Sequence, residues 1–143
     1  MTVLKSFSKL LIVLTLFIGA MAQAEVAVIV SASNGNGSLD KDTIERIFLG
    51  KTASFPDGSQ AIPVDQNEGS AAREAFNDKV LGKSSSQLKA YWSRLIFTGK
   101  GTPPKESGSD ADVVALVAKN PNLVGYVDAA AVDGSVKVVY KFQ

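Results

Sequence analysis

The feature that most constrains the fold of this chain is an uninterrupted apolar run, VAVIV, at residues 26–30. A strand with one face in water alternates polar and apolar side chains, whereas a run that is apolar throughout indicates a strand covered on both faces. A polar, glycine-containing stretch at residues 31–37 ends the run. The sequence therefore predicts a sheet with structure packed against both of its sides.

The rest of the chain supplies the elements that such a layered fold needs. Further strands are expected at residues 61–64, 123–127 and 136–140, with a small helical or turn segment at residues 129–131. Because Pro63 has no N–H for a ladder, its strand should lie at an edge or be bonded mainly on one side. Four helices are expected, and their capping residues are Asp40, Ser70, Ser84 and Ser109. Interleaved strands and helices predict an α/β domain over residues 25–143.

The helix that follows Ser84 has the most regular apolar pattern in the chain. Its apolar residues recur at i, i+3, i+4, i+7 and i+8, and they are Leu88, Tyr91, Trp92, Leu95 and Ile96. The two aromatic rings could stack on a sugar or a base, but the helical spacing favours a place in the core. The helix after Ser70 should end near residue 81, before Gly82. In the helix after Ser109 we expect Val113, Leu116 and Val117 to point inward, and residues 99–108 should form a flexible connection.

The first 24 residues have the pattern of a secretory signal peptide. Lys5 and Lys9 precede an apolar stretch, and small residues at positions 20–24 offer cleavage after Ala24 or after Ala22. An uncleaved anchor is the alternative, but the apolar run is short for the roughly 20 residues of a spanning helix. This segment predicts export to the periplasm, with no membrane span after processing.

Composition excludes several classes of function. The chain has no Cys and no His, which excludes disulfides, Cys/His zinc sites, and Ser-His-Asp or Cys-His catalysis. Loss of Lys5 and Lys9 with the leader turns the formal net charge from +1 to −1, and nucleic-acid binding needs a basic excess. We therefore predict a non-catalytic protein without a metal or other cofactor.

The sharpest candidate site is the start of the helix that follows Ser70. The N–H groups of Ala71, Ala72 and Arg73, the Ser70 hydroxyl and the positive end of the helix dipole could together cradle an anion after Gly69. The alternative is that Ser70 is an ordinary N-cap and that Arg73 lies in solvent. Three weaker candidates for the same site are Ser31, Gln66 and Glu68.

Several segments resemble the substrate-binding proteins of phosphate ABC importers, especially their short, single-lobe members. These segments are IFLGK at 47–51, IPVD at 62–65, GS followed by REAF within 69–76, YWSRLIFTGKG at 91–101 and VGYV at 124–127. The resemblance implies one lobe of a type II periplasmic binding protein, with a small, mostly parallel sheet flanked by helices. It also implies inorganic phosphate or a similar oxyanion as the ligand.

This chain departs from the importer motif Arg-x-Asp-Gly-Ser-Gly-Thr at several places. Gly69 and Ser70 match it and Glu68 takes the Asp position, but Gln66 stands in place of Arg. Ala71 and Ala72 replace the last Gly and Thr, so two side-chain ligands are missing. Two hypotheses follow: a periplasmic oxyanion-binding protein, or an interaction module derived from a solute-binding lobe that docks onto a membrane transporter or a periplasmic sensor.

Overall fold

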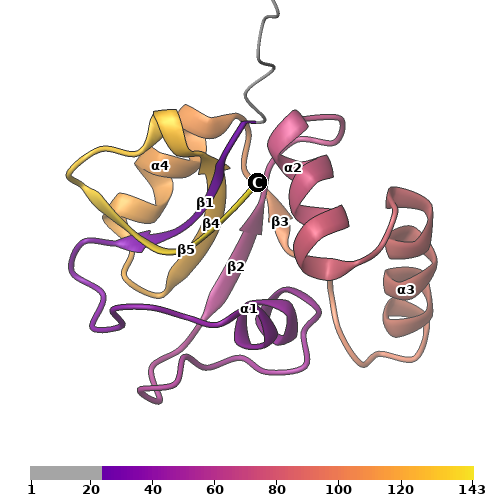
Figure 1. Ribbon diagram of the computed structural model, residues 1–143. Helices are drawn as coiled ribbons and strands as arrows, with labels where there is room; N and C mark the ends of the chain where they lie inside the picture. Colours follow the sequence, from indigo (N-terminus) through magenta and orange to yellow (C-terminus); the bar gives the residue numbers. More distant parts are fainter. Residues whose placement is uncertain (1–23) are drawn as a thin grey trace, which may run out of the picture.

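The computed structural model describes residues 24–143, so the predicted leader lies outside the described residues except for Ala24. Within this range, five strands form one sheet in the order β3-β2-β4-β1-β5 (Figure 1). The strands are β1 (Val26–Ser31), β2 (Ile62–Asp65), β3 (Lys105–Glu106), β4 (Leu123–Asp128) and β5 (Val136–Phe142). No helix in residues 24–143 has the length and apolar character that crossing a membrane requires.

The sheet is mixed. β2 is parallel to both β3 and β4, whereas β1 lies antiparallel between β4 and β5. Four strands therefore share one direction, in agreement with the mostly parallel sheet that the resemblance implies, and β1 alone is reversed. Every residue of β1 is buried, which confirms the prediction of a strand covered on both faces.

Helices cover the two faces of the sheet. Alternate residues of β1 point to opposite sides, so Val28 belongs to a core shared with α1 (Lys41–Phe48) and α2 (Ala71–Phe76), whereas Ile29 packs toward α4 (Asp110–Lys119). On the α1 and α2 side, the Phe76 ring stacks on Tyr126 at 4.2 Å between centroids. The result is the predicted α/β layered architecture (Figure 1).

The predicted caps and turns are present. Asp40 and Ser70 each accept a hydrogen bond from the backbone N–H three residues on, and Ser84 with Gln87 makes a capping box at the start of α3 (Ser85–Phe97). The predicted helix over residues 71–81 is α-helical only to Phe76. It continues as a π-helix, η1 (Asn77–Leu81), and ends at Gly82, whose φ of 62° lies in the left-handed region. Residues 129–131 form the expected short helix η2 (Ala129–Ala131).

Two predictions about burial are confirmed only in part. α3 stands away from the sheet (Figure 1), so Leu88 is buried while Tyr91, Trp92 and Leu95 are half-buried and Ile96 is exposed. The predicted core role of its apolar stripe is therefore only partly realised. In α4, Val113 and Val117 are buried as predicted, but Leu116 is 40% exposed and lines a hollow beside β2.

β3 was not expected, because it lies within the connection predicted to be flexible. Its two residues pair with Val64 and Asp65, while Ile62 and Pro63 pair only with β4. β2 therefore pairs with β4 at its start and with β3 at its end, in agreement with the expectation from Pro63 of bonding mainly on one side.

Candidate functional site

A network of charged groups lies where β2 ends. The Arg73 guanidinium donates from Nη1 to Glu106 Oε1 at 2.7 Å and to the Gln66 carbonyl at 2.8 Å, and its Nη2 lies 3.9 Å from Asp65 Oδ2. Burial acts to lower the pKa of Arg73, but the hydrogen bond to Glu106 and the negative charge of Asp65 outweigh it, so the pKa is raised. The positive charge of Arg73 is thus balanced by two carboxylates of the same chain.

Asp65 is also bonded to Tyr126. The Tyr126 hydroxyl donates to Asp65 Oδ1 at 2.6 Å and accepts from the Gln66 backbone N–H at 3.2 Å. Burial raises the pKa of Asp65, although the hydrogen bond from Tyr126 and the charge of Arg73 act in the opposite direction. Burial, together with the charge of Asp65, likewise raises the pKa of Tyr126. The pair holds the end of β2 against β4 and keeps the tyrosine hydroxyl protonated.

Gln66, which takes the place of the motif arginine, is a buried structural residue. Its side chain is enclosed, and Nε2 donates to Asp110 Oδ1 at 2.7 Å and to the Tyr126 carbonyl at 2.8 Å. Both donors of the amide are therefore used within the fold. Gln66 lies beside the start of α2 as the sequence predicts, but its donors are already paired.

The start of α2 borders a small cavity of about 130 Å³. Ser70, Ala71 and Ala72 line it, and helix geometry leaves the N–H groups of the two alanines without intrahelical acceptors. Two carboxylates, Asp110 and Asp128, line the same cavity. Ser70 Oγ accepts from the Arg73 backbone N–H at 3.1 Å, so the hydroxyl caps the helix. The backbone N–H groups are suited to bind an anion, but the two carboxylates that line the same cavity would repel it.

The other predicted site residues lie elsewhere. Arg73 lines a second cavity of about 390 Å³ together with Asp65, Glu106 and Glu68. Glu68 is exposed and pairs with Lys89 at 2.9 Å, and this hydrogen bond and charge lower the pKa of Glu68. The structure therefore keeps Ser70, Ala71 and Ala72 close together and places the Arg73 guanidinium and Glu68 in a different cavity.

Ser31 is far from this region. It ends β1 beside Val136, whereas the start of β1 pairs with Asp128 near α2, so Ser31 and Ser70 lie toward opposite ends of the sheet. Its Oγ donates to the Ala118 carbonyl at 3.2 Å. Ser31 is consequently a buried structural residue outside the cavity at α2.

Sequence reasoning missed the acidic partners of the site. Tyr126 stands in a predicted strand and Asp65 directly follows another, but nothing in their spacing shows that they meet. Glu106 lies in the segment expected to be flexible, and no local sequence pattern indicates that it pairs with Arg73. Within residues 24–143, no group of three or more acidic side chains is arranged to hold a metal ion.

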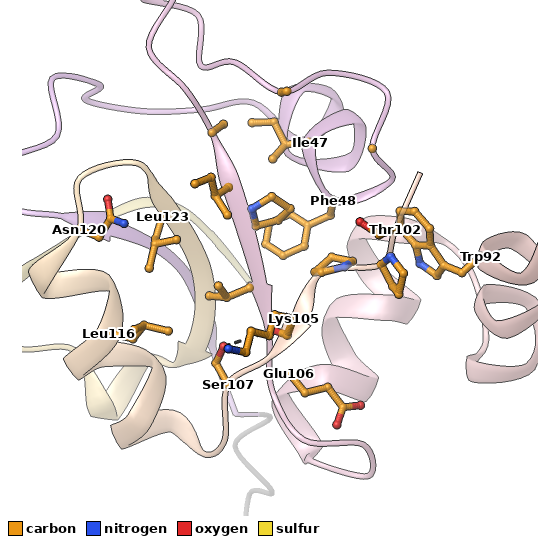
Figure 2. A pocket seen from close by; sticks show the side chains of 18 of the residues that line it. Ile47, Phe48, Trp92, Thr102, Lys105, Glu106, Ser107, Leu116, Asn120 and Leu123 are labelled. Atoms are coloured by element: carbon orange, nitrogen blue, oxygen red, sulfur yellow. Dashed lines mark hydrogen bonds between the residues drawn. The ribbon is translucent and has the colours of Figure 1, made fainter. Parts of the chain in front are cut away.

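A larger cleft lies on the other side of the charged network, beside β2. Its volume is about 680 Å³, and Figure 2 shows it between Leu116 and Leu123 on one side and Phe48, Trp92 and Thr102 on the other. Pro103, Pro104, Glu106, Phe48 and Trp92 line both this cleft and the cavity that contains Arg73. The segment that leads into β3 thus separates the two hollows. We name the larger one the β2 cleft.

Comparison with known proteins relates the fold to one class of binding protein. No protein-family model and no curated protein matches the sequence. A solved structure from Clostridium perfringens, assigned as a phosphate ABC transporter substrate-binding protein and holding bound phosphate, matches 81% of this chain with a TM-score of 0.65 and 24% identity. The alignment covers 45% of that protein.

Two further solved structures give the same result. An ABC-type phosphate transport receptor from Vibrio cholerae matches with a TM-score of 0.63 and 20% identity over 81% of this chain and 46% of its own. PstS from Borrelia burgdorferi matches with a TM-score of 0.59 and 11% identity over 81% and 47%. This chain therefore spans about half the length of each, and it is structurally similar to phosphate ABC transporter substrate-binding proteins, with the α/β fold of half of such a protein.

Proposed function

We propose that this protein is a non-catalytic interaction module, exported to the periplasm through its leader and built on one lobe of the phosphate-importer binding-protein fold. Its partner would be a membrane transporter or the periplasmic part of a sensor. The observation that carries the proposal is the apolar end of α3, where Phe97 and Ile96 are 93% and 54% exposed. Exposed apolar side chains that gather on one surface mark sites of contact with a partner protein, and aromatic anchors carry much of the energy of such contacts.

The charged groups near α2 support the same proposal. Tight oxyanion binding draws much of its free energy from charge-assisted hydrogen bonds, each contributing about 1.5–3 kcal/mol. Arg73, the cation nearest to the start of α2 in the sequence, is paired with Glu106 and directed away from the Ser70 cavity.

Cross-linking followed by purification from periplasm tests this proposal. We expect the wild-type protein to capture one partner in stoichiometric amount and Phe97→Asp to lose it, because the substitution places a charge at the proposed contact. Lys79→Asp, on η1, is the control at another exposed position and should capture as wild type does. Equal capture by Phe97→Asp and wild type, or no partner for either, would contradict the proposal.

Oxyanion binding at the start of α2 is the second candidate function. The free N–H groups of Ala71 and Ala72 favour it, as does the phosphate bound in the Clostridium perfringens protein. Calorimetric titration with phosphate and with sulfate is the test, using Ser70→Asp as the variant in which a carboxylate opposes the anion. Heat of binding in wild type that is absent in Ser70→Asp would support this candidate. The absence of both heat and a thermal shift at millimolar phosphate would exclude it.

A further inference from the structure

We propose that the β2 cleft binds a small amphipathic carboxylate, with the apolar body of the ligand in the cleft and its carboxylate on Lys105. This site is separate from the start of α2 and from the exposed end of α3, because neither Ser70 nor Phe97 lines it. The inference therefore does not depend on the function proposed above, and a purified protein without any partner is enough to test it.

The size and lining of the cleft suit an apolar ligand. Its volume of about 680 Å³ falls within the range of about 300–1,000 Å³ that is usual for small-molecule sites. Ile62 and Leu116, which are 37% and 40% exposed, face it from the sheet edge and from α4. Phe48, Trp92, Pro103 and Pro104 line the opposite part. Burying such side chains stabilises a complex by about 25 cal/mol per Å² of apolar surface.

The charges around the cleft favour an anionic end group. Lys105 is the one cationic side chain among the lining residues, and no ion pair to it occurs within residues 24–143. The two acidic lining residues are already engaged: Glu106 pairs with Arg73, and Asp112 Oδ2 accepts from the N–H and hydroxyl of Ser109. A single carboxylate would therefore meet an unpaired cation.

The backbone places Lys105 on the appropriate face of the sheet. Lys105 pairs with Val64, and partners in register point their side chains to the same side. Val64 packs with Val113 and Val117 of α4, so Lys105 lies on the α4 side beside Leu116. Figure 2 shows Lys105 next to Ser107, on the same side of the cleft as Leu116.

β3 is held in place by contacts on its other side. Glu106 is fixed by Arg73, and the Ser107 N–H donates to the Asp65 carbonyl at 2.8 Å. The short strand that carries Lys105 is thereby anchored at two points before any ligand arrives. Such preorganisation lowers the entropic cost of binding. The charged network therefore supports the cleft, although it lies outside it.

The same features disfavour free phosphate as the occupant. Phosphate is small and strongly hydrated, and one lysine in an apolar cleft offers too few hydrogen bonds to replace its water. A carboxylate with an alkyl or aryl body leaves its head in partly solvated surroundings and buries only apolar surface. We therefore expect both parts of the ligand to affect its affinity: the apolar body is required for binding, and the negative charge strengthens it.

Trp92 makes the test direct, because it lines the cleft and is the only tryptophan in the chain. The probes are octanoate, 1-octanol as a neutral ligand with the same chain length, and inorganic phosphate, each titrated into the purified protein. We expect a saturable change in Trp92 fluorescence with octanoate and a smaller affinity for octanol. Phosphate at 10 mM should cause no change and should not displace octanoate.

Two variants separate the two parts of the proposed site. Lys105→Gln should raise the dissociation constant of octanoate by about three- to fivefold and leave that of octanol unchanged. Leu116→Gln should weaken both ligands by about fivefold or more. Lys79→Gln, on η1 and away from the cleft, is the matched control and should match wild type. Circular dichroism confirms that each variant is folded.

Three results would overturn the inference. The first is no saturable response to octanoate in a folded protein. The second is equal affinity for octanoate and octanol, which would leave an apolar cleft without carboxylate recognition. The third is an octanoate response that Lys105→Gln leaves intact. Capture of a partner through Phe97 bears on none of these, so the two proposals fail or succeed separately.

Discussion

α3 and α4 have similar sequence patterns, but they lie differently relative to the sheet. α3 and α4 each begin with a serine whose backbone N–H bonds to the side chain three residues on, Gln87 or Asp112, and each carries an apolar stripe. α4 buries Val113, Val114 and Val117, whereas α3 buries only Leu88. Helical periodicity therefore predicts which segments form helices, but the opposing surface decides how much of each helix is buried.

The sheet surface that faces α4 allows this helix to approach closely. Gly125 in β4 faces this helix, and a Cβ built there would lie 2.7 Å from Val113 Cγ1 and 3.4 Å from Val117 Cγ2. α3 has no comparable partner in the sheet. It is held by loop contacts, where Trp92 packs over Gly50 and the Tyr91 hydroxyl donates to the Leu49 carbonyl at 2.6 Å. One helix is part of the core and the other lies beside it.

The largest effect should come from placing a charge under α4. Val117→Asp buries a carboxylate among Ala27, Ile29 and Val127, where it has no partner. An unpaired buried charge is among the substitutions that destabilise most, so we expect a loss of more than about 4 kcal/mol of unfolding free energy or failure to fold. Urea unfolding followed by circular dichroism measures it. A stable, wild-type-like transition would show that α4 is not part of the core.

Filling the space beside Gly125 should have the next largest effect. Gly125→Ala adds a methyl group that meets Val113 at 2.7 Å, so α4 must shift, and the side chain of Val64, 3.2 Å away, must also give way slightly. We expect a destabilisation of about 1–3 kcal/mol, as is usual for overpacking. Thermal unfolding measures it. Gly134→Ala is the control, because nothing lies within 4 Å of its Cβ position.

Removal of a cap should have a smaller and local effect on α3. In Ser84→Ala the N–H of Gln87 loses the hydroxyl that now accepts its hydrogen bond at 3.2 Å, a loss of about 1 kcal/mol. Because α3 makes few buried contacts, this loss should appear as faster hydrogen exchange in the first turn of α3. Amides of β1 should be unaffected. Faster exchange throughout the protein would show that α3 is coupled to the core.

The comparison also shows which parts of the fold and of the candidate site can be predicted from the sequence. The caps, the buried strand β1 and the layered fold follow from local chemistry, and all were predictable. β3 was not, because the two residues of Lys105–Glu106 form a strand only by pairing with β2. The same holds for the candidate site. Ser70 was recognised as a cap, but the pairing of Arg73 with Glu106 joins residues that are 33 positions apart, and no local pattern encodes it.

The smallest expected change in stability gives the clearest contrast between α3 and α4. Ile96→Asp makes on α3 the same kind of change as Val117→Asp makes on α4, yet Ile96 is already 54% exposed. The new carboxylate keeps its water, so the free energy of unfolding should change by no more than about 0.5 kcal/mol. A large loss would mean that the end of α3 is packed in solution, and the proposal that a partner covers it would then lose its basis. If the free energy of unfolding is unchanged and partner capture is lost, the exposed apolar residues of α3 are needed for binding and not for folding.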